Sequence, residues 1–178
     1  MSNAVYFVSS LPMIQFKDAP PMSVEEFKRQ CETNLNDFEL GAIEALLDGK
    51  DYPEPFVSAF YSHETQLKNI AARARATEWD SDIRIMDRPF DGYNVAYAKM
   101  VNDALVKANP LEMEEALEEA RFYLADELSG VGSFTMAHVY AYALKLKILE
   151  RLSKLNQEAG NTALLKIINE NDLAIERE

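Results

Sequence analysis

Cysteine is nearly absent from this sequence, because Cys31 is the only one among its 178 residues. A single cysteine excludes an internal disulfide bond and a zinc site built from several cysteines, and it is typical of a reducing compartment. No apolar run approaches the ~20 residues that a membrane span needs, and the short run at residues 5–8 has no basic segment before it. The sequence therefore predicts a cytoplasmic protein without a signal peptide or a transmembrane helix.

Positive charge is also scarce in the chain. It has 18 basic and 30 acidic residues, which give a formal net charge of -12 at pH 7. An average field of this sign repels phosphate backbones and anionic lipid head groups. The best candidate for a local basic patch is Lys68, Arg73 and Arg75, but three charges on one helix more often form a solvated face. We therefore expect neither nucleic acid nor a membrane surface as a direct partner.

The common motifs of phosphate-binding and hydrolase sites are missing. The chain has no Gly-x-x-x-x-Gly-Lys loop, no Gly-x-Gly-x-x-Gly after a strand and no Gly-x-Ser-x-Gly elbow. It also lacks internal repeats, low-complexity tracts and the sustained apolar-polar alternation of a strand. The remaining signal is helical periodicity, which predicts an all-α bundle of about six to seven helices in a single domain over residues 1–178. Two small lobes with a boundary near residues 78–92 are the alternative.

Capping residues predict where the helices begin. Ser23 with Glu26, and Asn36 with Glu39, have the spacing of capping boxes that open two helices. Prolines and glycines supply the other boundaries, and residues 78–92 are expected to form a connecting loop. The expected helices cover residues 24–34, 37–48, 53–77, 93–108, 110–129, 134–160 and 161–170.

Apolar residues at helical spacing predict which side chains form the core. Residues 139–146 are apolar nearly all round, so their helix is expected to lie at the centre of the fold. Residues 5–16 are apolar with a proline in the middle, and we expect an extended or briefly helical segment buried against the body. The other side chains expected to face inward are Phe38, Ile43, Leu46, Leu47, Phe56, Phe60, His63, Leu67, Ile70, Ala74, Val95, Ala98, Val101, Leu105, Met113, Leu117, Ala120, Leu124, Leu128, Ile148, Leu152 and Leu155.

The two histidines are the first candidates for metal or acid-base chemistry. His63 lies on an apolar helical stripe and is expected to be a core residue with a satisfied hydrogen bond, while the adjacent Glu64 points elsewhere. His138 has no acidic residue three or four positions later, which does not match a di-metal carboxylate bundle. We expect both histidines to be structural. The alternative is a small helical metal-binding protein or enzyme in which His63, His138 and nearby carboxylates act together.

Acidic residues gather on the predicted helix over residues 110–129. They are Glu112, Glu114, Glu115, Glu118, Glu119 and Asp126. Sites for hard cations place their oxygens on a tight turn with a glycine, whereas this run is helical, so we expect a solvated face. Cys31 has no base near it in the sequence and is expected to be a small, partly buried side chain, not a nucleophile. We therefore predict no catalytic residue, no cofactor and no metal site.

Aromatic residues are frequent in the second half of the chain. More of them occur there than one side of each helix can bury, and tyrosines are common at protein interfaces. Core packing is the first interpretation of these residues, and a partner surface is the second. The residues concerned are Tyr93, Tyr97, Phe122, Tyr123, Tyr140 and Tyr142.

Three segments together form a pattern that extends over most of the chain. The first is Tyr6-Phe7-Val8-Ser9-Ser10-Leu11-Pro12, followed by Pro20-Pro21-Met22-Ser23. The second is Leu67-Lys68-Asn69-Ile70-Ala71-Ala72-Arg73-Ala74-Arg75-Ala76, and the third is His138-Val139-Tyr140-Ala141-Tyr142-Ala143-Leu144-Lys145-Leu146-Lys147-Ile148-Leu149-Glu150-Arg151. This pattern resembles an uncharacterised family of bacterial proteins encoded beside V/A-type ATPase genes, although Lys68 stands where that family usually has an arginine.

The resemblance implies a function that composition and periodicity do not. The family has no established activity, but its ATPase-linked context points to a partner, and residues 141–151 are loosely similar to late helices of a stalk subunit of the rotary ATPases. It therefore implies a non-catalytic interaction subunit or accessory stalk factor of a V/A-type ATPase, held at the membrane periphery through that complex. A helical scaffold without an ATPase link is a further alternative.

Overall fold

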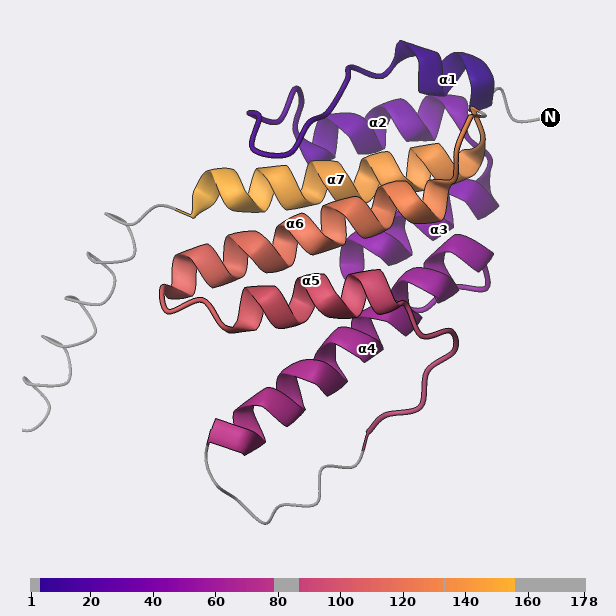
Figure 1. Ribbon diagram of the computed structural model, residues 1–178. Helices are drawn as coiled ribbons and strands as arrows, with labels where there is room; N and C mark the ends of the chain where they lie inside the picture. The colour runs from indigo at the N-terminus through magenta and orange to yellow at the C-terminus, as the bar shows by residue number, and fades with distance from the viewer. Residues whose placement is uncertain (1–3, 79–86, 133, 156–178) are drawn as a thin grey trace, which may run out of the picture.

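The fold consists of α-helices in a computed structural model that describes residues 4–78, 87–132 and 134–155. Within these residues there are seven helices and no strand, which confirms the all-α prediction (Figure 1). None of these helices is long and apolar enough to cross a lipid bilayer. The helices are α1 (Ala4–Ser10), α2 (Val24–Asn34), α3 (Asp37–Asp48), α4 (Pro55–Glu78), α5 (Val95–Leu105), α6 (Pro110–Ser129) and α7 (Met136–Lys154).

Local capping explains the bounds of α2 and α3, which are those predicted. The Ser23 hydroxyl accepts a hydrogen bond from the Glu26 N–H at 3.1 Å. Asn36 and Glu39 each accept a hydrogen bond from the other's backbone N–H, at 3.0 and 3.1 Å. α3 ends at Gly49, whose φ of 76° lies in the left-handed region that glycine adopts without strain. Short-range chemistry therefore determines both ends of the α3 helix.

The helices α5 and α7 are shorter than predicted. Asn94 accepts a hydrogen bond from the Tyr97 N–H at 2.9 Å, so α5 starts two residues after Tyr93. α7 ends at Lys154 because Leu155 has extended backbone angles, with φ of -82° and ψ of 110°. The prediction that this helix continues to residue 160 is therefore wrong. The helix predicted over residues 161–170 lies outside the described residues.

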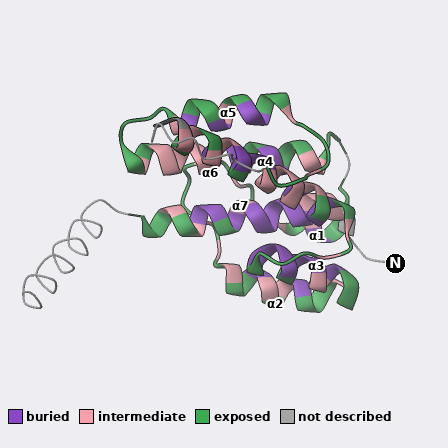
Figure 2. Ribbon diagram, turned by 90° about the horizontal axis from the view of Figure 1, so that it is seen from below, coloured by how far each residue is buried: buried purple, intermediate pink, exposed green. Residues whose placement is uncertain are grey.

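The helix α7 lies at the centre of the fold, as its apolar sequence predicts. In Figure 2 it runs between a layer formed by α2 and α3 and a layer formed by α4, α5 and α6. It contacts α1, α2, α3 and α6, while α6 also packs against α4 and α5. Eight residues of α7 from Val139 onward are buried with no more than 6% exposure, and Tyr142 is buried with 9%. Neighbouring helices cover α7 on several sides, and accordingly most of its surface is apolar.

The N-terminal segment is briefly helical, as predicted for residues 5–16, but it is buried only in part, since Val5, Tyr6 and Met13 are exposed. Phe7 of α1 is buried and its ring lies 6.2 Å from that of Phe27 on α2. Phe16 lies farther along the segment, and its ring meets that of Phe122 on α6 edge to face at 5.5 Å. Aromatic contacts therefore attach the segment at two separate places.

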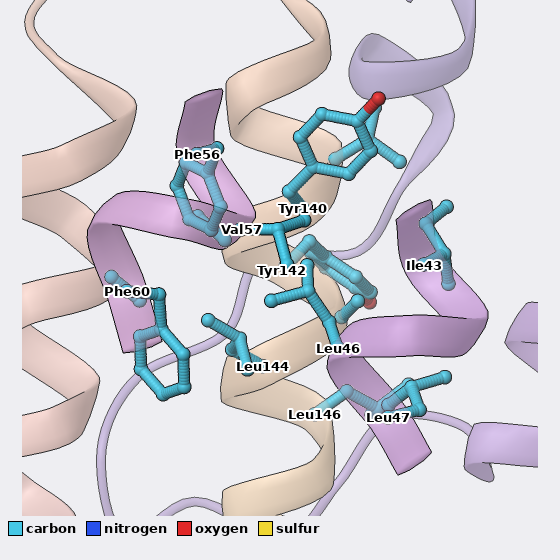
Figure 3. Packing of buried hydrophobic residues seen from close by; sticks show 14 of the residues in the cluster. Ile43, Leu46, Leu47, Phe56, Val57, Phe60, Tyr140, Tyr142, Leu144 and Leu146 are labelled. Atoms are coloured by element: carbon cyan, nitrogen blue, oxygen red, sulfur yellow. The ribbon is translucent and has the colours of Figure 1, made fainter. Parts of the chain in front are cut away.

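The core is formed where α3, α4 and α7 meet. Figure 3 shows Leu46 of α3, Val57 of α4 and Leu144 of α7 converging on one another. Leu146 of α7 belongs to the same cluster and has no exposed surface. Burial of each such side chain stabilises the fold by roughly 1.5 to 3 kcal/mol relative to exposure. The predicted stripes therefore describe the core correctly at most positions.

Three side chains that were predicted to face inward are exposed: Phe38, Val95 and Leu155, the last of which follows the end of α7 and retains 39% of its surface. Phe38 retains 51% of its surface, and its ring packs on Tyr52 at 5.3 Å outside the core. Val95 retains 72% because it is the first residue of α5, whose buried face begins at Tyr97 and Ala98. Phe38 and Val95 both lie in the first turn of a helix. A periodic pattern does not indicate whether a neighbouring element buries a side chain in that turn.

Replacement of Leu146 by alanine is expected to lower the free energy of unfolding by about 2 to 5 kcal/mol, because it leaves a cavity in a closed part of the core. Urea denaturation followed by circular dichroism measures this change. Val106→Ala serves as the control, since Val106 is 82% exposed and its loss is expected to cost less than about 0.5 kcal/mol. Equal midpoints for the two variants would contradict the central position of α7.

Candidate functional site

A chain of ion pairs crosses the interior between α4, α6 and α7. Glu118 of α6 is only 3% exposed, so the prediction that it belongs to a solvated face is wrong. Glu114, Glu118 and Arg121 follow one another at spacings of four and three residues, which places them on one face of α6. That face is turned toward α4 and α7, and the spacing alone does not reveal these neighbours.

Two arginines bind Glu118, both through its Oε1. The Arg121 Nη1 donates to Glu118 Oε1 at 3.1 Å, and its Nε donates to Glu64 Oε1 at 2.7 Å. The Arg151 guanidinium of α7 bonds both Glu118 and Glu114. The five side chains therefore alternate in charge, in the order Glu64, Arg121, Glu118, Arg151, Glu114. We name them the ion-pair chain.

Burial and pairing act on the pKa values of the ion-pair chain in opposite directions. Burial raises the pKa of the Glu118 carboxyl, while the charges of Arg121 and Arg151 pull it back down. Burial by itself lowers the pKa of Arg121, but the charge of Glu64 and the hydrogen bond to it outweigh this effect and raise that pKa overall. Arg121 is therefore the cation on which the neutralisation of this cluster depends.

A cleft of about 440 Å³ opens beside the ion-pair chain, between α3, α4, α6 and α7. On its α3 side, Tyr61 donates a hydrogen bond to the Ala45 carbonyl at 3.1 Å, and Lys147 donates one to the Leu47 carbonyl at 2.7 Å. The bond to Leu47 satisfies a carbonyl in the last turn of α3, where helical partners run out, whereas the Ala45 carbonyl also accepts from the backbone N–H groups of Gly49 and Lys50. Lys68 of α4 also lines the cleft. The cleft therefore has hydrogen-bonded groups on its α3 side and several cationic side chains in its lining.

The two histidines take part in separate local contacts. His63 is half-buried, with its Nδ1 at 3.4 Å from Gln66 Oε1 and its ring edge to face with Tyr97 at 6.0 Å. His138 lies in the first turn of α7, where its Nδ1 is 3.1 Å from the Thr135 hydroxyl. Both contacts agree with the structural roles predicted for these residues. In the part of the chain that the structure describes, no three His, Cys, Asp or Glu side chains are grouped as metal ligands.

The remaining candidates lie in different surroundings. Cys31 is fully buried in α2, and burial together with the charge of Glu32 raises the pKa of its thiol to about 12, which opposes nucleophilic chemistry. Lys68, Arg73 and Arg75 do not act as one basic patch, because Lys68 lines the cleft and Arg73 pairs with Asp87.

The aromatic residues divide between the core and the surface. Tyr97, Phe122, Tyr140 and Tyr142 are buried, which confirms core packing for them. Among buried side chains in the described ranges, the Tyr142 hydroxyl alone has no hydrogen-bond partner. Tyr93 and Tyr123 are 64% and 50% exposed, so core packing does not hold for these two, and the second interpretation, a partner surface, stays a prediction for them.

Four exposed apolar side chains lie in the segments next to the junction between the start of α5 and the end of α6, and we name them the α5–α6 patch. Asn94 donates a hydrogen bond to Glu127 at 2.9 Å across this junction. Tyr93 and Val95 flank Asn94. Tyr123 lies one helical turn before Glu127, and Val131 lies just beyond the end of α6. The members of this α5–α6 patch, all at least half exposed, are Tyr93, Val95, Tyr123 and Val131.

Polar side chains of α4 hold the segment that leads into the patch. Gln66 is almost fully buried and exchanges two hydrogen bonds with the Asn94 backbone, at 2.7 and 3.1 Å. Asn69 exchanges two more with the backbone of Arg88, at 2.8 and 3.0 Å. Neither contact was predicted from the sequence. The sequence holds no decisive signal for them, because an amide side chain beside an apolar helical stripe suits water as well as a buried backbone partner.

Comparison with known proteins finds no matching family model, no similar curated protein and no similar solved structure. The fold and its surfaces define the class of protein as all-helical, with a charged interior cleft and an exposed apolar patch among the described residues. The resemblance to a family encoded beside ATPase genes stays a prediction, as does the lobe boundary near residues 78–92.

Replacement of Arg121 by methionine is expected to lower the free energy of unfolding by about 3 to 5 kcal/mol, because it leaves Glu64 and Glu118 without their shared cation. Lys99→Met is the matched control, since Lys99 is exposed on α5 and its change is expected to stay within about 0.5 kcal/mol. Urea denaturation at neutral pH compares the two variants. A loss of stability no greater than that of the control would contradict a supporting role for the ion-pair chain.

The stability cost of Arg121→Met is expected to shrink as the pH falls from about 7 to about 5. Burial already raises the pKa of Glu118, and removal of Arg121 raises it further. A carboxyl with a higher pKa in the folded state binds more protons when folded, so acidification stabilises the variant relative to the wild type. Unfolding curves at several pH values measure the difference. A gap that stays constant or widens would contradict this assignment.

Proposed function

We propose that this protein is a non-catalytic interaction subunit or accessory factor of a V/A-type ATPase, which acts through protein-protein contacts. The observation that carries the contact role is the α5–α6 patch, where two tyrosines and two valines are at least half exposed. Tyrosine is enriched among the residues that contribute most to protein interfaces. Its ring buries a large area while its hydroxyl still bonds water or a partner.

The surroundings of the patch support this role, because hydrogen bonds hold Asn94, which lies between Tyr93 and Val95. Gln66 binds Asn94 from α4, and Asn94 in turn binds Glu127 of α6. Phe90 packs on the ring of Tyr93 with their centroids 6.3 Å apart. A patch that is ordered before binding loses less conformational entropy when a partner docks, so more of the contact energy appears as affinity.

The charge around the patch indicates the kind of partner surface that fits it. Asp91 and Glu127 are exposed beside Tyr93 and Asn94, and the whole chain carries a formal charge of -12. An acidic rim raises the association rate with a basic surface and disfavours acidic ones. We therefore expect the docking surface on the ATPase to be apolar at its centre and basic at its edge.

The ATPase as partner follows from the resemblance of three segments of the chain to a family encoded beside ATPase genes. The third of those segments lies in α7, where most of its side chains are buried. Its sequence pattern is therefore explained by packing, and the contact with a partner falls to other surfaces. The α5–α6 patch is the surface best suited to it.

Copurification from native membranes in mild detergent tests the proposal. The tagged wild-type chain is expected to bring down ATPase subunits, and Tyr93→Ala with Tyr123→Ala is expected to reduce their yield by at least about tenfold, since each lost anchor costs more than about 1 kcal/mol. Phe38→Ala is the matched control, because Phe38 is a similarly exposed aromatic residue on α3.

Two outcomes would contradict different parts of the proposal. Clean absence of ATPase subunits from the wild-type sample would remove the ATPase as partner. Equal recovery with the double variant and with the Phe38 control would remove the α5–α6 patch as the contact surface. The replaced side chains are exposed, so the variants are expected to remain folded. Circular dichroism of all three proteins checks this.

A further inference from the structure

We propose that the cleft between α3, α4, α6 and α7 binds a small oxyanion, a carboxylate or a phosphate group, through Lys68 and Lys147. The cleft has a volume of about 440 Å³, which is within the range of small-molecule sites. Its charged side chains come from three helices, α4, α6 and α7. The site therefore exists only in the folded protein.

The formal charge of the cleft differs in sign from that of the whole chain. Glutamates 64, 114 and 118 contribute three negative charges to its lining. Four positive charges come from Lys68, Arg121, Lys147 and Arg151, so the lining carries a net charge of +1. The chain as a whole has a formal charge of -12. A locally positive hollow in an acidic protein concentrates the field on an anion of small size.

The acidic side chains of the cleft are already occupied. Both carboxylate oxygens of Glu64 accept hydrogen bonds from Arg121. Glu118 accepts from Arg121 and Arg151, and Glu114 accepts from Arg151. A metal cation would have to displace these guanidinium groups from a partly buried position. The groups of the cleft that can still form hydrogen bonds are therefore donors.

Two lysines provide those donors. Lys147 has three N–H groups, of which one bonds the Leu47 carbonyl at 2.7 Å. Within the described residues, Lys68 has no ion pair with a carboxylate. Both lysines line the same cleft. An oxyanion accepts hydrogen bonds from charged donors more strongly than from neutral ones, which suits this pair.

The remaining lining limits the size and character of the ligand. Leu46, Phe60, Leu144 and Ile148 add an apolar wall to the cleft. The acidic remainder of the protein repels extended polyanions such as nucleic acid. A compact organic acid or phosphate ester with a short apolar part fits these conditions, and its anionic group is the feature that the lysines recognise.

This inference is independent of the proposed docking role. The α5–α6 patch lies at the start of α5 and the end of α6, whereas the cleft is lined by the end of α3 and by inner residues of α4, α6 and α7. Loss of one function by mutation therefore leaves the other measurable.

Titration of the full-length, isotopically labelled chain with inorganic phosphate and, separately, with acetate tests the inference by backbone amide NMR. Saturable shifts are expected at Gly49 and around Lys147, at constant ionic strength set with sodium chloride. Lys147→Gln and Lys68→Gln are each expected to weaken binding by about tenfold, as loss of one charge-assisted hydrogen bond does. Lys145→Gln is the matched control, because Lys145 lies on the same helix and pairs with Asp126 outside the cleft.

The anion that saturates the shifts identifies the chemical group, and saturation by either one supports the site. Shifts that follow ionic strength alone, or equal affinity for the wild type and both cleft variants, would overturn the proposal. Lys68→Gln keeps the test decisive if Lys147→Gln disturbs the fold, because Lys68 is exposed and its removal breaks no ion pair among the described residues.

Discussion

Glu118 carries a negative charge into a position with almost no access to water, and the neutralisation of that charge constrains the arrangement of three helices. An ionised carboxylate in such a place is stable only when cations and hydrogen bonds surround it. Arg121 supplies one cation from the next turn of α6, and Arg151 supplies the other from α7. Because Arg121 also reaches Glu64, the same cluster sets the position of α4 relative to α6.

The polar interior and the apolar core depend on the same central helix. α7 contributes Leu144 and Leu146 to the core, and Lys147 and Arg151 to the cleft. Apolar packing is tolerant of small shifts, whereas charge pairs require particular distances and directions. The ion pairs therefore require particular distances and directions between side chains, whereas the apolar core mainly requires that its volume be filled. A cleft beside such a cluster is already ordered before any ligand arrives.

Local signals predicted the helices well where the determining groups lie within one turn. The caps at Ser23 and Asn36 bond residues three positions away, so α2 and α3 were predicted with their observed bounds. Predictions failed where a distant element decides the outcome. Phe38 and Val95 have the right spacing for the core and yet remain exposed, whereas Glu39 and Tyr97 in the same helical turns are buried. The periodicity of α7 likewise extends beyond Lys154, although the helix stops there.

The sequence by itself determined the all-α class, the caps and the central place of α7, because these follow from contacts within a few residues and from the total apolar surface of one helix. Only the tertiary structure decided that Glu118 is buried and that Gln66 reaches Asn94. The physical reason is that a charged or amide side chain at one position suits both water and a buried partner. Which of the two it meets depends on residues far away in the chain.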